Sequence, residues 1–254
     1  ILALATAPLI DANKAVKAST SQRRNRVVTD SFEPGSTMKT FVVASALREK
    51  IVAPNTTYNT EKGLLKIGNR VIHEAEMDHR WSALQVSEIL AFSSNIGTTK
   101  IAFDLGAESL RAGLRDFGFG TKTGVDFPGE VKGTLQSLPW IQHLLANVSF
   151  GHGITASPLQ IANAYAVIAN GGVLNTPYLV QSTRDLETGI VTEIKPKQIR
   201  RVLSETDAAA MRLMLNGVTS GGGTGVNARV EGYPVAGKTG TAQKVNPTGR
   251  GYLP

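Results

Sequence analysis

The sequence contains no cysteine among its 254 residues. This absence excludes disulfide scaffolds, thiolate zinc sites, iron–sulfur clusters and cysteine nucleophiles, and it is compatible with any redox compartment. Long apolar runs are missing too, since the stretch Ile1–Ala5 is far shorter than the roughly 20 residues that a membrane span needs. We therefore expect no bilayer-spanning segment in these residues, and we interpret Ile1–Ala5 as a buried strand.

A large excess of charge of one sign is also absent. The 27 basic and 20 acidic residues give a net charge of +7, and 41% of the residues are hydrophobic, which excludes a disordered chain. The basic residues are dispersed, apart from Arg23–Arg26 and Arg200–Arg201, and no aromatic residues interleave them. The pattern favours a solvated basic face over nucleic-acid binding, in one large domain or two small ones.

Apolar periodicity predicts more helices than strands, and therefore an α+β fold. Turn residues mark the ends of these helices, with Ser36 and Ser204 as N-caps and Gly171–Gly172 as a stop signal. Helices are predicted over residues 36–50, 84–92, 96–106, 107–117, 158–170 and 205–217. Strands are predicted over residues 178–183, 190–194 and 233–245, and loops over residues 12–35 and 53–80.

A hydroxyl and an amine are spaced one helical turn apart at Ser36 and Lys39. At this spacing the Lys39 amine can take the proton of the Ser36 hydroxyl, which would make the serine a nucleophile. About one such spacing is expected by chance, and the alternative is a helix N-cap followed by a surface lysine. Pro34-Gly35 and the apolar run after Lys39 favour a rigid corner, which suits a nucleophile.

Two further motifs carry hydroxyl, amide and amine groups. Ser93-Ser94-Asn95 interrupts a helical pattern and is interpreted either as polar groups facing a cleft or as a simple helix cap. Lys-Thr-Gly occurs twice, at Lys122–Gly124 and at Lys238–Gly240. The first lies in a turn-rich loop and is interpreted as structural. The second lies in an extended run whose glycines would let a substrate backbone approach closely.

Other patterns are weaker. Gly232–Thr239 matches the phosphate-binding loop pattern, but its middle is strand-like rather than glycine-rich, which argues against a nucleotide-binding enzyme. His73–His79 lacks the spacing of a metal site and is interpreted as a solvated loop. His152, between two glycines, has no partner that the sequence identifies. No metal or cofactor is expected.

In this order, Ser36-x-x-Lys39, Ser93-x-Asn95 and Lys238-Thr239-Gly240 resemble the signatures of penicillin-recognising serine enzymes. The surrounding sequence is similar to the transpeptidase domain of class B penicillin-binding proteins, over essentially the whole chain. The form Phe32-Glu33-Pro34-Gly35-Ser36 resembles the septal, division-specific branch more than the elongation branch. The similarity extends to Arg24–Arg26, Asp30, Ser149–Gly153, Ser157–Gln160 and Ala236–Lys244.

The resemblance implies a penicillin-binding transpeptidase or serine β-lactamase-like fold, with a central antiparallel sheet flanked by an all-helical subdomain. The expected division is one domain over 1–254, with a helical subdomain at 53–175 inserted between sheet segments 1–52 and 176–254. Family members have an earlier strand and several later ones, so we expect a fragment with an incomplete sheet. The family's membrane anchor and pedestal domain are not in this sequence.

The implied activity is cross-linking of peptidoglycan stem peptides through an acyl-enzyme on Ser36, with covalent inhibition by β-lactams. Lys39 would take the hydroxyl proton, Ser93 would relay a proton and Asn95 would hold the substrate amide. Lys238 would favour a neutral Lys39 by charge repulsion and attract the substrate carboxylate. The catalytic residues are thus expected to be Ser36, Lys39, Ser93 and Lys238, and the substrate-binding residues Asn95, Thr239, Gly240 and Thr241. The N–H groups of Ser36 and Thr241 would form the oxyanion hole.

The implied setting is the cell wall at the division septum, on the periplasmic face of the cytoplasmic membrane. Expected partners are stem peptides, β-lactams, a septal glycosyltransferase and other division proteins, with no nucleic acid. Three alternatives stay open: a β-lactam-hydrolysing enzyme of the same fold, a β-lactam sensor, and an unreactive fragment or scaffold that only binds partners.

Overall fold

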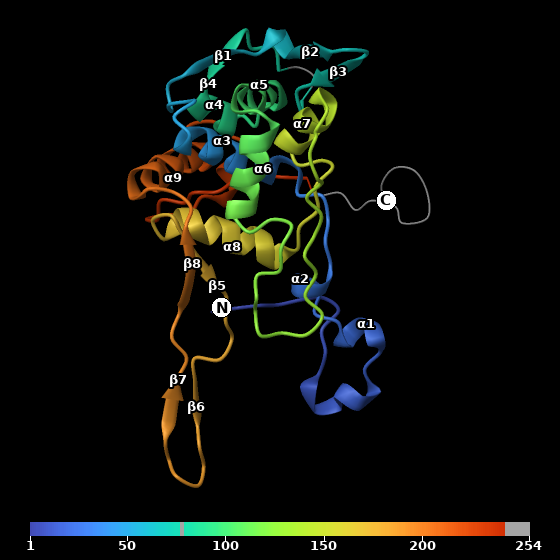
Figure 1. The fold of residues 1–254 in the computed structure, drawn as a ribbon, viewed down its shortest axis with the longest axis vertical. Helices are drawn as coiled ribbons and strands as arrows, with labels where there is room; N and C mark the ends of the chain where they lie inside the picture. The colour runs from blue at the N-terminus through green and yellow to red at the C-terminus, as the bar shows by residue number, and fades with distance from the viewer. Residues whose placement is uncertain (77–78, 242–254) are drawn as a thin grey trace.

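The structure is a computed structural model that describes residues 1–76 and 79–241, and Figure 1 shows its fold. The helices are α1 (Thr20–Arg23), α2 (Arg26–Thr29), α3 (Lys39–Arg48), α4 (Val86–Ala91), α5 (Asn95–Leu105), α6 (Ala107–Asp116), α7 (Gln142–Ser149), α8 (Pro158–Ala169) and α9 (Glu205–Thr219). The strands are β1 (Thr57–Asn59), β2 (Leu64–Ile67), β3 (Arg70–His73), β4 (Ala83–Gln85), β5 (Val173–Thr176), β6 (Ser182–Arg184), β7 (Val191–Glu193) and β8 (Lys197–Arg201). This is the α+β fold that the sequence predicts.

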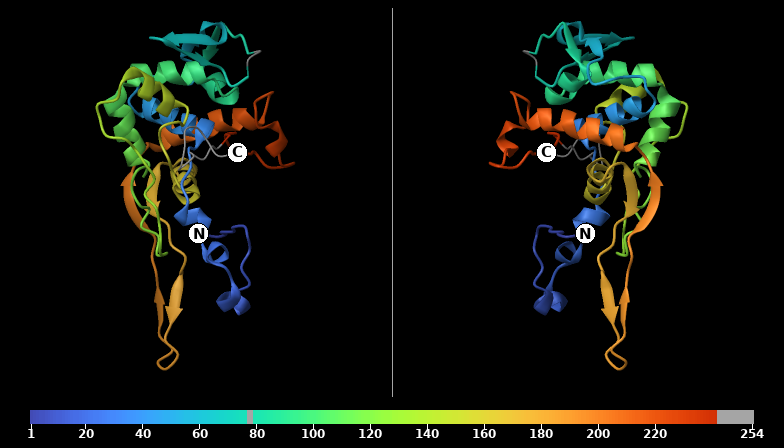
Figure 2. Two further views of the ribbon diagram at one scale, coloured as in Figure 1. Left: turned by 90° about the vertical axis from the view of Figure 1, so that its right-hand side faces the viewer. Right: turned by 90° about the vertical axis from the view of Figure 1, so that its left-hand side faces the viewer.

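Helix α3 lies in the middle of the helical body, with α5 on one side and α8 on the other (Figures 1 and 2). Every residue from Lys39 to Leu47 is buried, because the apolar run leaves this helix no polar face for solvent. The Phe41 ring packs against the rings of Phe117, Phe119 and Tyr165 at centroid distances of 5.0–5.1 Å. Fully burying a side chain of this size stabilises the fold by about 1.5–3 kcal/mol. This packing fixes the helix that begins at Lys39.

Local capping signals confirm the predicted starts of two helices. The Ser204 hydroxyl accepts a hydrogen bond from the Asp207 N–H at 3.0 Å and starts α9. Ser157 and Gln160 form a capping box at the start of α8, where Pro158 takes the first helical position. Predicted helices over 84–92, 96–106 and 107–117 correspond to α4, α5 and α6.

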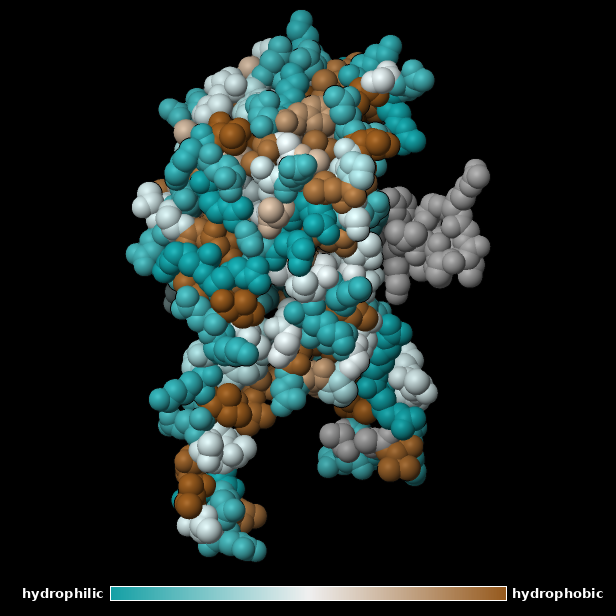
Figure 3. Space-filling model, in the orientation of Figure 1, coloured by the Kyte–Doolittle hydropathy of each residue, from teal (hydrophilic) through white to brown (hydrophobic). Residues whose placement is uncertain are grey.

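The strands pair only as antiparallel two-stranded units in the described part of the chain. β5 pairs with β8 and contacts α8, which places this sheet beside the helical body. The β6–β7 hairpin continues away from the body, and Figure 2 shows it as an extension separate from the α1 segment. Its side chains Leu186, Ile190 and Val191 are exposed, and apolar surface is visible along this extension in Figure 3.

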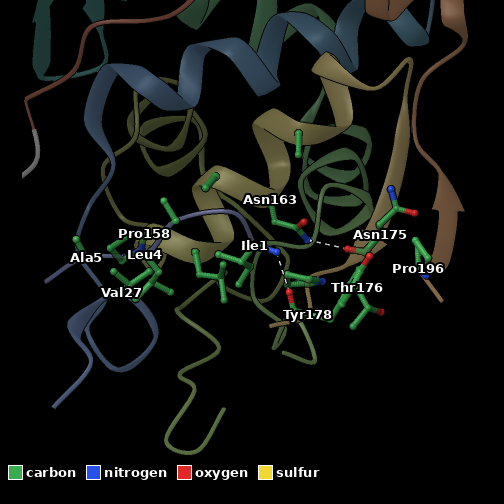
Figure 4. A pocket seen from close by; sticks show the side chains of 15 residues that line it. Ile1, Leu4, Ala5, Val27, Pro158, Asn163, Asn175, Thr176, Tyr178 and Pro196 are labelled. Atoms are coloured by element: carbon green, nitrogen blue, oxygen red, sulfur yellow. Dashed lines mark hydrogen bonds between the residues drawn. The ribbon is translucent and has the colours of Figure 1, made fainter. Parts of the chain in front are cut away.

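The prediction of a buried strand at Ile1–Ala5 is wrong. Among the described residues no strand pairs with it, and Leu2 is fully exposed. The Ile1 amine instead donates a hydrogen bond to the Tyr178 carbonyl oxygen at 2.8 Å. Ile1 and Leu4 line an apolar pocket of about 560 Å³ against Pro158 and Tyr178 (Figure 4). The apolar residues of Ile1–Ala5 therefore make apolar contacts, but their backbone does not pair with a strand in the described part of the chain.

Three further predictions need correction. The predicted loop 12–35 contains α1 and α2, and the loop 53–80 contains β1, β2 and β3. The hairpin of β2 and β3 forms because Leu65, Ile67 and Ile72 share a small apolar cluster with Ile96 of α5. The predicted strand 233–245 is unpaired beyond an isolated bridge at Tyr233 as far as Thr241, and its remainder lies outside the described residues. No local pattern in the sequence predicts α7, β5 or β8.

The core runs through all three predicted segments. Phe41, Leu90 and Met211 belong to one buried cluster, although they come from the first, second and third segments. The division into a helical subdomain at 53–175 and two sheet segments stays a prediction. Within the described residues, no helix combines the length and apolar character needed to cross a membrane.

Candidate active site

Ser36 lies inside a tight 3-10 turn, Gly35–Met38, that leads directly into α3. The expectation that Ser36 caps a helix is wrong, because Pro34 occupies the cap position and the Ser36 side chain makes no hydrogen bond in the described part of the structure. The hydroxyl of this half-buried residue is therefore unbonded among the described residues. Gly35 adopts φ +56°, and a Cβ there would collide with the Thr241 carbonyl oxygen. The turn is thus shaped by the segment that passes beside it.

Lys39, one turn after Ser36, is fully buried. Its amine Nζ contacts the Ser93 carbonyl oxygen, lies 3.2 Å from Ser93 Oγ and lies 2.7 Å from Asn95 Oδ1. The alternative of a surface lysine is excluded by this burial. Three separate sequence positions, Lys39, Ser93 and Asn95, therefore meet at one nitrogen atom.

Burial lowers the pKa of Lys39 well below its ordinary value, and the nearby positive charge of Lys238 lowers it further. The carboxylate of Glu74 acts in the opposite direction. A neutral amine has two N–H bonds and one lone pair, and the Ser93 carbonyl and the Asn95 Oδ1 can only accept hydrogen bonds. They orient both N–H bonds, so the lone pair stays available to a hydroxyl proton. Repulsion by Lys238 was predicted as the cause; burial is the larger one.

The Ser93-Ser94-Asn95 corner joins α4 to α5 and serves two purposes. Ser94 caps α5, its hydroxyl accepting a hydrogen bond from the Gly97 N–H at 2.9 Å. Ser93 instead adopts φ +59°, an uncommon conformation for a residue with a side chain, and it is buried. This conformation turns both polar groups of Ser93 toward the Lys39 amine. The sequence offered two interpretations of this corner, and each applies to a different residue. Ser94 is the helix cap, and Ser93 is the polar residue that faces Lys39.

Glu74 supports this corner, and the sequence analysis missed it. Its two carboxylate oxygens accept hydrogen bonds of 2.6 Å from the Ser94 hydroxyl and from the Asn95 backbone N–H. The Asn95 side-chain amide donates to the His73 carbonyl oxygen at 2.8 Å. The segment read as a solvated loop thus contains a buried carboxylate. Only the loop's position against α5, which no local pattern reveals, distinguishes Glu74 from its exposed neighbour Glu76.

The second Lys-Thr-Gly segment lies beside the Ser36 turn. A Cβ on Gly240 would lie 2.7 Å from the Thr37 side chain and 3.3 Å from its backbone nitrogen, so only glycine fits without displacement. Thr239 is held by Thr224, the two hydroxyl oxygens lying 2.7 Å apart. Burial lowers the pKa of Lys238 to about 8. The segment is held by side chains and by close backbone approach, not by a strand ladder.

A pair formed by the buried Glu33 and the half-buried His152 ties the Ser36 turn to the glycine-rich turn near residue 152. The Glu33 carboxylate lies 2.9 Å from His152 Nδ1 and accepts a hydrogen bond from the Gly153 N–H at 2.7 Å. The Gly35 N–H also donates to the Gly151 carbonyl oxygen, at 3.2 Å. The structure thus supplies the partner for His152 that the sequence did not identify.

The structure gathers the residues singled out from the sequence around one corner of α3. Lys39 contacts Ser93 and Asn95, Lys238 influences the charge of Lys39, and Gly240 and Thr241 approach the turn that contains Ser36. Along Gly232–Thr239, and as far as Thr241, no helix follows that could cradle a phosphate. Within residues 1–76 and 79–241, no group of three or more His, Asp or Glu is placed to hold a metal ion.

Comparison with known proteins finds one family that matches the whole chain. The family model of the penicillin binding protein transpeptidase domain matches residues 1–254. The chain is 36% identical over 246 residues to the probable peptidoglycan D,D-transpeptidase PenA of Neisseria flavescens, covering 96% of this chain and 58% of that protein. It is 35% identical over 252 residues to the peptidoglycan D,D-transpeptidase FtsI of Escherichia coli K12, covering 98% of this chain and 40% of FtsI.

Solved structures show the same fold. The transpeptidase domain of penicillin-binding protein 3 from Burkholderia pseudomallei superposes with a TM-score of 0.78 at 38% identity, over 91% of this chain and 66% of that one. Penicillin-binding protein 3 from Mycobacterium tuberculosis in complex with aztreonam gives a TM-score of 0.83 at 33% identity, over 90% and 52% respectively. The chain therefore spans about half the length of these relatives.

Proposed function

The chain belongs to the penicillin-binding protein transpeptidase domain family, and on that premise we propose that it is a serine D,D-transpeptidase of the acyltransferase class. Its proposed substrates are peptidoglycan stem peptides that end in D-Ala-D-Ala. The observation that carries the proposal is the fully buried Lys39 amine, one turn from a free Ser36 hydroxyl. Burial and the charge of Lys238 lower the pKa of Lys39, which favours the neutral amine that can act as a base, and Ser36 makes no hydrogen bond among the described residues.

In the proposed acylation, Ser36 Oγ attacks the carbonyl carbon of the penultimate D-Ala while Lys39 Nζ takes the hydroxyl proton. The tetrahedral intermediate then breaks its C–N bond, and the terminal D-Ala leaves with a proton relayed from Lys39 through Ser93. This relay is supported by the 3.2 Å separation of Lys39 Nζ and Ser93 Oγ. The amine of a second stem peptide then attacks the ester and restores the Ser36 hydroxyl. Every proton taken by Lys39 is returned within one cycle.

The Lys238 segment would bind the substrate and stabilise the transition state. Backbone N–H groups of Ser36 and Thr241 are the proposed oxyanion hole, a contribution of about 3–4 kcal/mol in comparable sites. The Lys238 amine and the hydroxyls of Thr239 and Thr241 would bind the terminal carboxylate. Gly240 would keep the backbone close to the Ser36 turn, as its contact with Thr37 supports. Asn95 would hold the substrate amide that precedes the reacting carbonyl.

The proposed setting is septal cell-wall synthesis at the outer face of the cytoplasmic membrane. The names of the relatives PenA and FtsI support peptidoglycan cross-linking, and the complex of a neighbour with aztreonam supports β-lactams as covalent inhibitors. A septal glycosyltransferase and other division proteins are the proposed partners. We also propose that residues 53–175 form a helical subdomain inserted between the sheet segments 1–52 and 176–254.

Intact-mass spectrometry of the purified protein with benzylpenicillin tests this function, with Ser36→Ala as the control. We expect an adduct of one penicilloyl group that persists for many minutes and is absent from the Ser36→Ala protein. An adduct on Ser36→Ala would contradict the nucleophile. A rapidly lost adduct would indicate a β-lactamase, and a stable adduct without D-Ala release from stem peptides would indicate a sensor. No adduct from a cooperatively folded protein would indicate a binding scaffold.

A further inference from the structure

A hydroxyl group from α8 reaches the turn that contains Ser36. The Tyr165 Oη atom lies 3.2 Å from the Thr37 carbonyl oxygen and 2.9 Å from Thr40 Oγ1. Because a carbonyl oxygen can only accept, Tyr165 donates its one proton to Thr37, and the Thr40 hydroxyl donates to Tyr165. These two threonines directly follow Ser36 and Lys39 in the sequence. One phenol oxygen is therefore bonded to the neighbours of both the proposed nucleophile and the proposed base.

The packing around Tyr165 fixes where its hydroxyl lies. The half-buried ring meets the Phe41 ring edge-on at a centroid distance of 5.0 Å. Helix α8 is itself secured at its start by the Ser157–Gln160 capping box, and the Gln160 amide donates to two carbonyl oxygens of the loop after α6. Burial raises the pKa of Tyr165 to about 12, so the phenol keeps its proton at neutral pH and remains a donor.

The turn around Ser36 has local hydrogen bonds of its own. The Thr37 hydroxyl donates to the Pro34 carbonyl oxygen at 2.9 Å, and the Lys39 N–H donates to the Ser36 carbonyl oxygen. A 3-10 turn has poorer hydrogen-bond geometry than an α-helix, so contacts from other segments help to fix its conformation. The bond from Tyr165 comes from 128 positions away in the sequence and links this turn to the first turn of α3. The relative placement of Ser36 and Lys39 therefore depends on this contact.

We propose that Tyr165 is a positioning residue, whose hydroxyl bonds to Thr37 and Thr40 keep Ser36 and Lys39 in register for proton transfer. The inference rests on the proposed function, in which Lys39 Nζ takes the proton of Ser36 Oγ. A displacement of about 1 Å between reacting groups can slow a reaction by up to about 10²-fold. Loss of the hydroxyl should therefore slow the acylation step itself. The alternative is that this hydroxyl only stabilises the fold.

Tyr165→Phe removes the hydroxyl and keeps the ring against Phe41. Stopped-flow acylation over a range of benzylpenicillin concentrations separates the first-order acylation constant from the dissociation constant of the noncovalent complex. We expect the acylation constant to fall about tenfold, as the loss of one hydrogen bond allows, and the dissociation constant to stay within about twofold. A hydroxyl that only stabilises the fold would leave the acylation constant of the folded protein unchanged.

Tyr58→Phe is the matched control. Tyr58 is a half-buried tyrosine of β1, and its hydroxyl donates to the Asp104 carboxylate at 2.7 Å. Its replacement should leave the acylation constant unchanged. Thr40→Val keeps the bond from Tyr165 to Thr37 and should lower that constant only about twofold. Thr40→Val combined with Tyr165→Phe should lose no more than Tyr165→Phe alone, because both changes act through the same phenol oxygen.

Three results would overturn the inference. These are an unchanged acylation constant in Tyr165→Phe, an equal loss in Tyr58→Phe, and a Tyr165→Phe protein without a cooperative unfolding transition by circular dichroism. The last result would assign the hydroxyl to folding. Failure of benzylpenicillin to acylate the wild type would instead overturn the proposed function.

Discussion

The tripeptide Lys-Thr-Gly occurs twice in this chain, and its two copies occupy unlike environments. At Lys122–Gly124 the lysine is exposed, and the threonine is buried against Glu130, whose carboxylate accepts from the Thr123 hydroxyl at 2.6 Å and from its N–H at 2.8 Å. At Lys238–Gly240 the lysine is half-buried, and the threonine hydroxyl meets Thr224. One copy secures a loop, and the other faces the candidate site.

The difference teaches that the contacts around a motif decide its chemistry. Burial lowers the pKa of Lys238 to about 8, whereas Lys122 extends into solvent. Gly240 is required by the approach of Thr37. Each copy can therefore be changed separately, with the other serving as its control.

The largest expected effect on acylation comes from replacing Lys238, and Lys122 serves as its control. Lys238→Ala should lower the second-order rate of acylation by benzylpenicillin about 10²–10³-fold, because a preorganised charge on the drug carboxylate is lost. Lys122→Ala should leave that rate unchanged. Stopped-flow acylation measures both. If both variants lost the same acylation rate, or if neither lost any, the two Lys-Thr-Gly segments would not differ in function.

The pH dependence of acylation sharpens the same contrast. Lys39 must be neutral to act as the base, and burial lowers its pKa, which favours the neutral amine. Lys238 must be charged, and its pKa of about 8 means that the charge is lost as the pH rises above that value. The acylation rate should therefore be about halved near pH 8 and should fall by about tenfold per pH unit well above it.

Lys238→Arg provides the control for this pH profile. Arginine keeps its charge throughout the measurable range, so the alkaline decline should move upward by more than about one pH unit. A decline that stays at pH 8 in this variant would assign it to another group. Circular dichroism at each pH confirms that the protein is folded where rates are compared.

The smallest effect on activity is expected from the two threonines. Thr123→Val removes a buried donor from Glu130 and should lower the free energy of unfolding by about 1–3 kcal/mol, with little change in the acylation rate of folded protein. Thr239→Val should do the reverse, lowering that rate only about threefold to tenfold. Urea denaturation and acylation kinetics separate the two quantities.

Thr121→Val is the matched control for Thr123→Val. Thr121 is exposed, and among the described residues its hydroxyl bonds only to the Gly118 carbonyl oxygen, at 3.0 Å, so the change should stay within about 0.5 kcal/mol. Equal destabilisation by both valines would remove the special role of Thr123.

The site was largely accessible from the sequence because its motifs are short and local. Ser36 and Lys39 are one turn apart in any helical continuation of their turn, and the Ser93–Asn95 break interrupts an apolar period that is easily read. Glu74 and His152 were not accessible, because each acts through a contact with a distant segment. Nothing around Glu74 distinguishes it from a solvated acid.

The fold shows the same division between local and distant causes. Helices α8 and α9 carry capping serines and apolar periods, which are local causes of helix formation, and both were predicted. The hairpin of β2 and β3 was missed, since it depends on packing against Ile96. Ile1–Ala5 was misread as a strand, since a strand needs a partner that no local pattern supplies.

The sequence by itself determined where the main helices lie, that Ser157 and Ser204 cap two of them, and that a serine and a lysine are spaced one turn apart. Only the tertiary structure decided that Lys39 is buried and its pKa lowered, that Lys238 rather than Lys122 adds its charge, and that Glu74 supports the corner at Ser94 and Asn95. The physical reason is the sequence distance over which each interaction acts. Helix periodicity and capping arise between residues three or four apart, whereas burial and electrostatic influence depend on what the rest of the chain places around a group.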